Sequence, residues 1–214
     1  MQTCPITIEQ ARGLYEKGGG GHDFDHVLRV TALAERIARA EGADLAVVRT
    51  AALLHDVGES GGRHEHHLAG AAMARELLRD EPPAFVAAVA HVIEAHRFRA
   101  DPEPQTIEAR ALSDADKLDA IGATGIGRAF AYAGAHGTAL WRLPWREIVA
   151  AAGNAVSAPQ ALGADYTPVH EFVYKLDRIP DRLYTAAARA IAAERRAFMQ
   201  TFFEQLDAEM TGQA

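Results

Sequence analysis

AALLHDVGES, residues 51–60, carries four apolar side chains directly into His55 and Asp56. The apolar run belongs to a longer segment, residues 44–56, whose apolar residues recur at the spacing of an amphipathic helix: Leu45, Val48, Ala52 and Leu53. Asp44 can cap the start of this helix, and Gly58 marks its expected end. Because burial of an imidazole and a carboxylate is costly unless partners satisfy them, the stretch predicts a helix that delivers both groups to a polar site.

Helical patterns dominate the rest of the chain as well. Further helices are predicted at residues 23–40, 65–79, 83–96, 106–120 and 181–210. The last of these is expected to present one apolar face: Tyr184, Ala187, Ile191, Phe198, Phe202 and Leu206. No alternating strand pattern is found, and no linker divides the chain. We therefore expect an all-α, single-domain helical bundle spanning residues 1–214, with core motifs at 20–130 and C-terminal helices at 168–210 packing on them.

Composition narrows the class of protein. Of the 214 residues, 49% are hydrophobic and 24% are charged, which is typical of a globular chain with a core to bury. The net charge of −7 argues against binding to a nucleic-acid polymer or a membrane surface. The single cysteine, Cys4, cannot form an intrachain disulfide, and no secretion signal or membrane-spanning apolar run is found. These features predict a cytoplasmic protein.

Additional metal-ligating side chains surround the His55–Asp56 pair in the sequence. His26 lies in the first turn of the preceding predicted helix, and three aspartates occur in LSDADKLDA, residues 112–120. Imidazole nitrogens and carboxylate oxygens together suit Mn²⁺, Fe²⁺, Ni²⁺ or Zn²⁺. Asp116 and Asp119 share one helical face, so spacing alone does not choose between them as a further ligand.

Three segments together resemble a known family. HDFDHVLRV (22–30), ALLHDVGE (52–59) and SDADKLDAIGATGIGRAF (113–130) follow one another in the order and at the separations of the H…HD…D signature. The chain in this respect is similar to the HD superfamily of metal-dependent phosphohydrolases. Residues 171–202 also resemble the C-terminal segment of the small stand-alone bacterial members, so the likeness covers about residues 20 to 205.

The resemblance implies a metal site and a chemistry. It assigns His26, His55, Asp56 and Asp116 as ligands of one divalent ion, with Mn²⁺ expected and Fe²⁺, Ni²⁺, Zn²⁺ or Mg²⁺ as alternatives. Glu59 matches an acidic position that related nucleotide hydrolases use to orient or deprotonate water. The implied reaction is hydrolysis of a phosphoester or phosphoanhydride in a small phosphorylated substrate, with a nucleotide as the expected substrate.

Other residues are candidates for binding the phosphate. Lys117, beside Asp116, is the first candidate for offsetting charge on the transferred group. His96 resembles a family position near the substrate, and Arg97 follows it. The histidines of RHEHH, residues 63–67, are interpreted as exposed, while Asp114 and Asp119 are interpreted as structural. No role is assigned to His22, His64, His66, His67 or His91.

Two alternative functions stay open at this point. In a di-iron oxygenase of the HD type, further histidines such as His91, His96 or the RHEHH cluster would hold a second iron. In a non-catalytic sensor, the same core would bind a signalling nucleotide without hydrolysing it. The sequence leaves both the substrate and the oligomeric state, monomer or homodimer, undecided.

Overall fold

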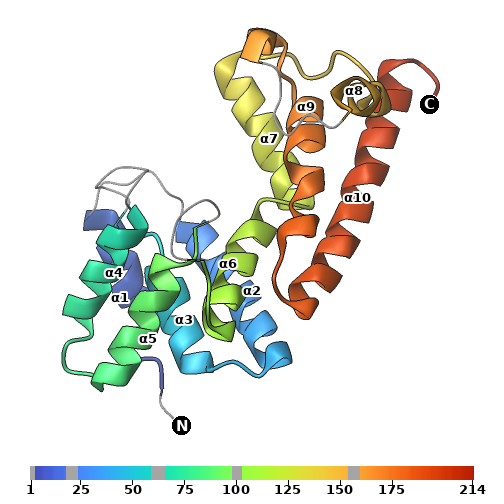
Figure 1. Ribbon diagram of the computed structural model, residues 1–214. Coiled ribbons are helices and arrows are strands. Elements are labelled where there is room, and N and C mark those ends of the chain that lie inside the picture. Colours follow the sequence, from blue (N-terminus) through green and yellow to red (C-terminus); the bar gives the residue numbers. More distant parts are fainter. Residues whose placement is uncertain (1–2, 18–23, 59–65, 98–102, 154–159) are drawn as a thin grey trace. The chain divides into compact units, whose positions relative to one another are not determined.

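The computed structural model describes residues 3–17, 24–58, 66–97, 103–153 and 160–214. Every regular element in these ranges is a helix, so the predicted all-α fold is confirmed. Figure 1 labels the α-helices, which are α1 (Ile8–Lys17), α2 (Phe24–Glu41), α3 (Leu45–Leu54), α4 (His66–Leu77), α5 (Pro83–Glu94), α6 (Ile107–Asp119), α7 (Ala123–His136), α8 (Trp145–Ala152), α9 (Pro168–Tyr174) and α10 (Ala186–Met210). The same ranges also contain the 3₁₀ helices η2 (Gln160–Asp165), η3 (Leu176–Arg178) and η4 (Pro180–Arg182). None of the described helices is long and apolar enough to cross a membrane.

The chain forms two compact units. The first unit comprises Met1–Lys117 and Tyr184–Ala188, and the second comprises Leu118–Leu183 and Arg189–Ala214. Helices α6 and α10 therefore contribute residues to both units. The expectation of a single domain over residues 1–214 stays a prediction, because two compact units can unfold either together or separately.

Helix α3 is the centre of the first unit. It packs against α2 and α5, and α5 packs in turn against α4. The Asp44 side chain accepts hydrogen bonds from Ala46 N at 2.8 Å and Val47 N at 3.2 Å, so the predicted cap is confirmed. Helix α3 ends at Leu54, earlier than predicted, and residues 55–58 continue as turns. The apolar run thus carries His55 and Asp56 into the core at the point where the helix stops.

The start of α10 differs from the prediction. Residues 180–182 form a 3₁₀ helix, and α10 begins only at Ala186. The Asp114 carboxylate accepts hydrogen bonds from Tyr184 N, from Thr185 N at 2.8 Å and from the Thr185 hydroxyl at 2.8 Å. These contacts satisfy donors that precede the helix, so a buried aspartate far away in sequence sets where α10 starts.

The predicted apolar face of α10 is wrong in part. Tyr184 and Phe198 are 41% and 50% exposed, although both were expected to be buried. Along the helix the buried side chains are Ala188, Ile191, Ala192, Met199 and Phe203. In the second unit the Phe203 ring stacks on Phe172 of α9, with ring centroids 4.4 Å apart. The contact with Phe172 determines which face of α10 is buried, and the periodicity of α10 alone does not reveal it.

Gly58 lies where the turn after α3 meets the backbone of α4. A Cβ atom at this residue would lie 2.4 Å from Gly70 N and 2.5 Å from His66 O. Gly58→Ala therefore forces the first turns of α4 away, and we expect a loss of about 1–3 kcal/mol in the free energy of unfolding. Thermal unfolding followed by circular dichroism measures it.

Gly13→Ala is the matched control for this substitution. Gly13 lies within α1, and a Cβ atom there would have no described atom within 4 Å. Alanine favours helix over glycine, so this variant should gain about 0.5–1 kcal/mol. A Gly58→Ala protein as stable as the wild type would contradict the close approach of the turn to α4.

Candidate metal centre

Four side chains of the first unit bring their polar atoms together. Nε2 of His26, in the first turn of α2, lies 3.7 Å from Oδ2 of Asp56 and 3.4 Å from Oδ1 of Asp116 on α6. Nε2 of His55 lies 3.3 Å from the same Oδ2 of Asp56. Of the four residues predicted from the H…HD…D signature, His26, His55 and Asp56 thus form one group that could hold an ion, and Asp116, 90 residues after His26, approaches this group at His26.

The His55 ring is held with one nitrogen facing this cluster. The side chain is fully buried, and its Nδ1–H donates to Ala52 O at 2.8 Å. Because the carbonyl accepts this proton, the lone pair of a neutral ring is on Nε2. Burial alone would lower the pKa of His55, but the Asp56 carboxylate outweighs it and raises that pKa.

Both carboxylates of the cluster stay ionised. Burial opposes the charge on Asp56, yet His55 and then His96 hold the pKa of Asp56 well below its usual range. For Asp116, burial is again outweighed, here first by the hydrogen bond from His26, and the pKa is lowered. Two negative oxygens therefore face two imidazole nitrogens in a largely buried space.

This donor set fits a divalent metal ion. Nε2 of His26 and Nε2 of His55 lie only 3.4 Å apart, and two nitrogen lone pairs at this distance repel unless a proton or a cation lies between them. With metal–ligand bonds of about 2.0–2.2 Å, two neighbouring ligands of one ion lie about 3–3.5 Å apart. The observed nitrogen–oxygen separations of 3.3–3.7 Å are close to that range.

The second oxygen of Asp56 faces another pair of histidines. Oδ1 lies 3.5 Å from Nε2 of His66 at the start of α4 and 3.7 Å from Nε2 of His96. The His96 Nδ1–H donates to Ile93 O at 2.6 Å, so this ring too directs Nε2 towards the carboxylate. Asp56, His66 and His96 form a second group that could hold an ion. Asp56 thus has one oxygen in each group.

The expected exposure of the RHEHH histidines is wrong for the two that the structure describes. His67 is only 4% exposed, and the His66 side chain is 14% exposed. Burial lowers the pKa of His67, and Nδ1 of this ring has no hydrogen-bond partner among the described residues. His64 lies outside the described residues. The sequence did contain a signal for this group, because several histidines within five residues are a composition typical of a metal site.

Lys117 lies beside Asp116 but directs its ammonium group elsewhere. Nζ donates to Ser113 O at 3.0 Å and to the Ser113 hydroxyl, and it lies 5.1 Å from the centre of the Tyr184 ring. Burial lowers the pKa of Lys117, against the opposing effect of Asp114 and Asp116. The Ser113 hydroxyl donates to His96 O at 2.9 Å, which links Lys117 to the second histidine group.

The structure describes only some of the other residues proposed from the sequence. Glu59 and His22 lie outside the described residues, and Arg97 follows His96 near the end of a described range. Asp119 is buried and lies 3.5 Å from Arg128, which supports the structural role expected for it. His91 lies on α5, and its Nε2 is buried without a hydrogen-bond partner in the described part of the chain.

Tyr15 of α1 supports the centre, although the sequence had no signal for it. Its hydroxyl accepts a hydrogen bond from Asp56 N at 3.2 Å and donates to Leu53 O at 3.3 Å. The two contacts join the last turn of α3 to the turn that follows it. Since they span about 40 residues of chain, no local pattern could have revealed this phenol as a positioning residue.

Comparison with known proteins assigns the family. Residues 23–121 match the family model of the HD domain. The chain is 34% identical to the Bacillus subtilis protein YpgQ over 197 residues, which cover 90% of this chain and 86% of YpgQ. The chain belongs to the HD-domain family. The predicted resemblance to HD-superfamily hydrolases is therefore confirmed.

Solved structures agree with this assignment. The crystal structure of Bacillus subtilis YpgQ in complex with ADP matches with a TM-score of 0.70 and 32% identity, covering 94% of both chains. An HD-superfamily hydrolase from Bacillus thuringiensis matches with a TM-score of 0.74 and 29% identity, covering 95% of this chain and 94% of that one. The converging His and Asp residues lie within the part of the chain that the family model covers.

Tyr15→Phe tests the support of Asp56. The variant removes the phenol oxygen but keeps the ring, which packs edge-on against Phe24. The buried Asp56 N–H then loses its acceptor, so we expect a loss of about 1–3 kcal/mol in the free energy of unfolding, measured by urea titration. Tyr132→Phe, at a 64% exposed position, should change it little. Equal stability of the two variants would contradict the role of Tyr15.

Proposed function

We propose that this protein is a metal-dependent phosphohydrolase that cleaves a phosphoester or phosphoanhydride of a nucleotide. The observation that carries the proposal is the convergence of His26, His55 and Asp56 on one buried point, with Oδ1 of the partly exposed Asp116 3.4 Å from Nε2 of His26. Two nitrogens and two carboxylate oxygens leave a six-coordinate ion with open positions for water and a phosphate oxygen. Hydrolysis is supported by the similar HD-superfamily hydrolase from Bacillus thuringiensis.

The proposed cofactor is a divalent ion, with Mn²⁺ expected and Fe²⁺, Ni²⁺, Zn²⁺ or Mg²⁺ as alternatives. Bound by these four residues, such an ion supplies Lewis acidity and lowers the pKa of a coordinated water. The protein's own part is to hold the ligands: Ala52 O orients the His55 ring, and Tyr15 holds the backbone of Asp56. Fixed ligands cost no rearrangement when phosphate charge develops.

The nucleotide substrate is supported by one relative. YpgQ, 32% identical to this chain, has a crystal structure in complex with ADP. We propose that a nucleotide binds here with its phosphates at the metal, and that His96 and Arg97 contribute to binding it. The position of His96 supports this role, because its Nε2 lies 3.7 Å from Oδ1 of Asp56, the oxygen that also faces His66.

The remaining catalytic assignments stay proposals. Glu59 comes three residues after Asp56 in the sequence and is proposed to orient the attacking water. Lys117 is proposed to offset charge on the transferred phosphoryl group. Since its ammonium group donates to Ser113, contact with phosphate would need a different side-chain rotamer. Without such a change, Lys117 acts on the site through its charge beside Asp116.

Activity assays test the proposal directly. Chelator-treated protein would be reloaded with Mn²⁺ and given nucleoside mono-, di- and triphosphates, with release of phosphate and pyrophosphate as the readout. We expect metal-dependent turnover that His55→Ala lowers by at least about a hundredfold, because a ligand is lost. His136→Ala, at an exposed position of α7, is the control and should stay active. Bound metal without turnover of any nucleotide would favour the sensor alternative.

A second candidate function rests on the two oxygens of Asp56. A carboxylate with His26 and His55 on one side and His66 and His96 on the other could bridge two ions. Such a pair of ions would suit a two-metal hydrolase or the di-iron oxygenase alternative. The oxygenase differs in requiring iron and consuming O₂, which an oxygen electrode measures.

Metal stoichiometry decides between one ion and two. We expect one tightly bound ion per chain by elemental analysis, lost in His55→Ala and kept in His66→Ala. Each of the two groups has three residues, but Asp116 adds a further donor 3.4 Å from His26 beside the first group, so we expect the single ion there. Two ions per chain, with His66→Ala removing only one of them, would overturn the single-ion proposal.

A further inference from the structure

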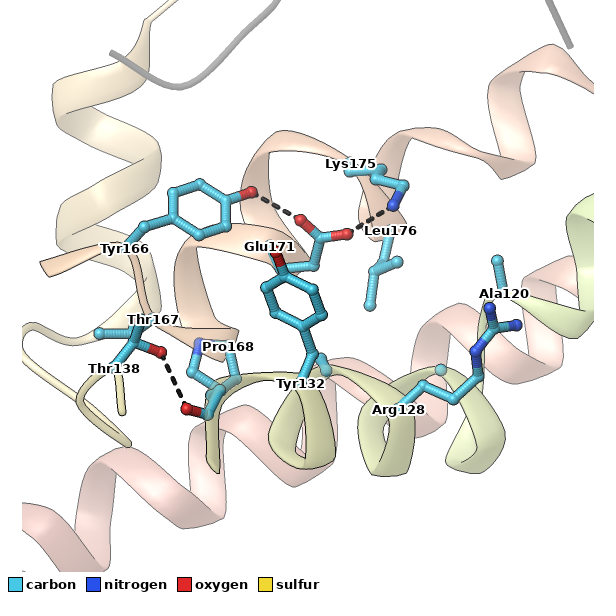
Figure 2. Close-up of a pocket in the computed structure, with 13 residues that line it drawn as sticks. Ala120, Arg128, Tyr132, Thr138, Tyr166, Thr167, Pro168, Glu171, Lys175 and Leu176 are labelled. Carbon is cyan, nitrogen blue, oxygen red and sulfur yellow. Dashed lines mark hydrogen bonds and ion pairs between the residues drawn. The ribbon is translucent and has the colours of Figure 1, made fainter. Parts of the chain in front are cut away.

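A separate cavity lies in the second unit, between α7 and α9 (Figure 2). Its volume is about 560 Å³, within the range of small-molecule sites in proteins. All of its lining residues fall between Ala120 and Leu176, so none belongs to the metal centre of the first unit. A ligand here would therefore be additional to the proposed substrate at the metal.

Small side chains on α7 create the space. Gly125, Ala129 and Ala133 recur every four residues and so share one helical face, which forms the floor of the cavity. At Gly125 a Cβ atom would lie 2.2 Å from Ala120 O, so glycine here permits a close approach of the Ala120 backbone to the start of α7. Across from this floor, Glu171, Lys175 and Leu176 of the α9 segment form the other side.

Two tyrosine rings offer flat apolar walls. The Tyr132 side chain is 64% exposed, and its ring stacks on His136 with centroids 3.9 Å apart. Tyr166 is held in place, because its hydroxyl donates to Oε2 of Glu171 at 2.7 Å. Figure 2 shows both rings at the cavity. Pre-formed aromatic walls of this kind favour a ligand that contains a planar ring.

One cation at the cavity, Arg128, has donors to offer an anionic group beyond its contact with Asp119. Lys175 Nζ donates to Oε1 of Glu171 at 2.6 Å, so these two charges neutralise each other, and both oxygens of Glu171 are occupied by Lys175 and Tyr166. Arg128 is the second cation of the lining, and it contacts Asp119 at the long distance of 3.5 Å. With five donors and a 57% exposed side chain, Arg128 can bind a phosphate bidentately.

We propose that this cavity is a second ligand site that binds a nucleoside monophosphate, with the base against Tyr132 and Tyr166 and the phosphate on Arg128. The base suits the aromatic walls, the phosphate suits the exposed guanidinium, and the cavity volume of about 560 Å³ lies within the range of small-molecule sites. The proposal does not depend on hydrolysis at the metal, since the two sets of residues lie in different units. A site of this kind would allow the protein to respond to the concentration of nucleotides.

Calorimetric titration of AMP into the chelator-treated full chain tests this site. We expect saturable 1:1 binding, which persists in His55→Ala because the metal centre takes no part. Arg128→Gln should weaken binding by about tenfold or more, since charge-assisted hydrogen bonds are lost. Ala129→Leu should abolish it by filling the floor of the cavity. Inorganic phosphate alone should bind more weakly than AMP, because it lacks the ring.

Arg146→Gln is the matched control, as Arg146 is an exposed arginine of the same unit that pairs with Glu204 and does not line the cavity. Circular dichroism checks that each variant is folded, and if Ala129→Leu does not fold, Arg128→Gln decides. Absence of saturable AMP binding at millimolar concentration would overturn the proposal. So would unchanged affinity in Arg128→Gln, or binding that disappears in His55→Ala.

Discussion

The buried carboxylate of Asp56 is the group around which the first unit is organised. Its two oxygens face imidazole nitrogens from four segments of the chain, at 3.3–3.7 Å. A charge at this depth is tolerated only when such partners surround it, and each partner must be brought by a different segment. The packing of α2 and α5 on α3, and of α4 on α5, can be understood as the framework that meets this requirement.

Another buried carboxylate has a purely structural task. Asp114, two residues before the proposed ligand Asp116, accepts the backbone N–H groups of Tyr184 and Thr185. Burial raises the pKa of Asp114, and these hydrogen bonds only partly oppose that effect. Neighbouring aspartates of one helix thus have different partners, because their side chains leave α6 in different directions.

The sequence predicted the all-α fold, and three of the four residues that it proposed as metal ligands, His26, His55 and Asp56, form a group that could hold an ion. Helices α2 to α6 were expected at nearly the observed positions, since periodicity and caps such as Asp44 act within a few residues, whereas no range was predicted for α1, α7, α8 or α9. Details that depend on distant residues were missed: the start of α10, its buried face, and the contribution of Tyr15. His66 was also missed as a neighbour of Asp56, because a histidine cluster at a helix start is exposed unless another helix covers it.

By itself, the sequence determined that the chain is helical and that His26, His55, Asp56 and Asp116 match a family signature. Local hydrogen bonding and side-chain periodicity are properties of short segments, and they can be detected without coordinates. Only the tertiary structure decided which oxygen of Asp56 faces which histidine, where Lys117 directs its charge, and that α7 and α9 enclose a cavity. These features depend on distances between residues far apart in the chain, and packing alone sets such distances.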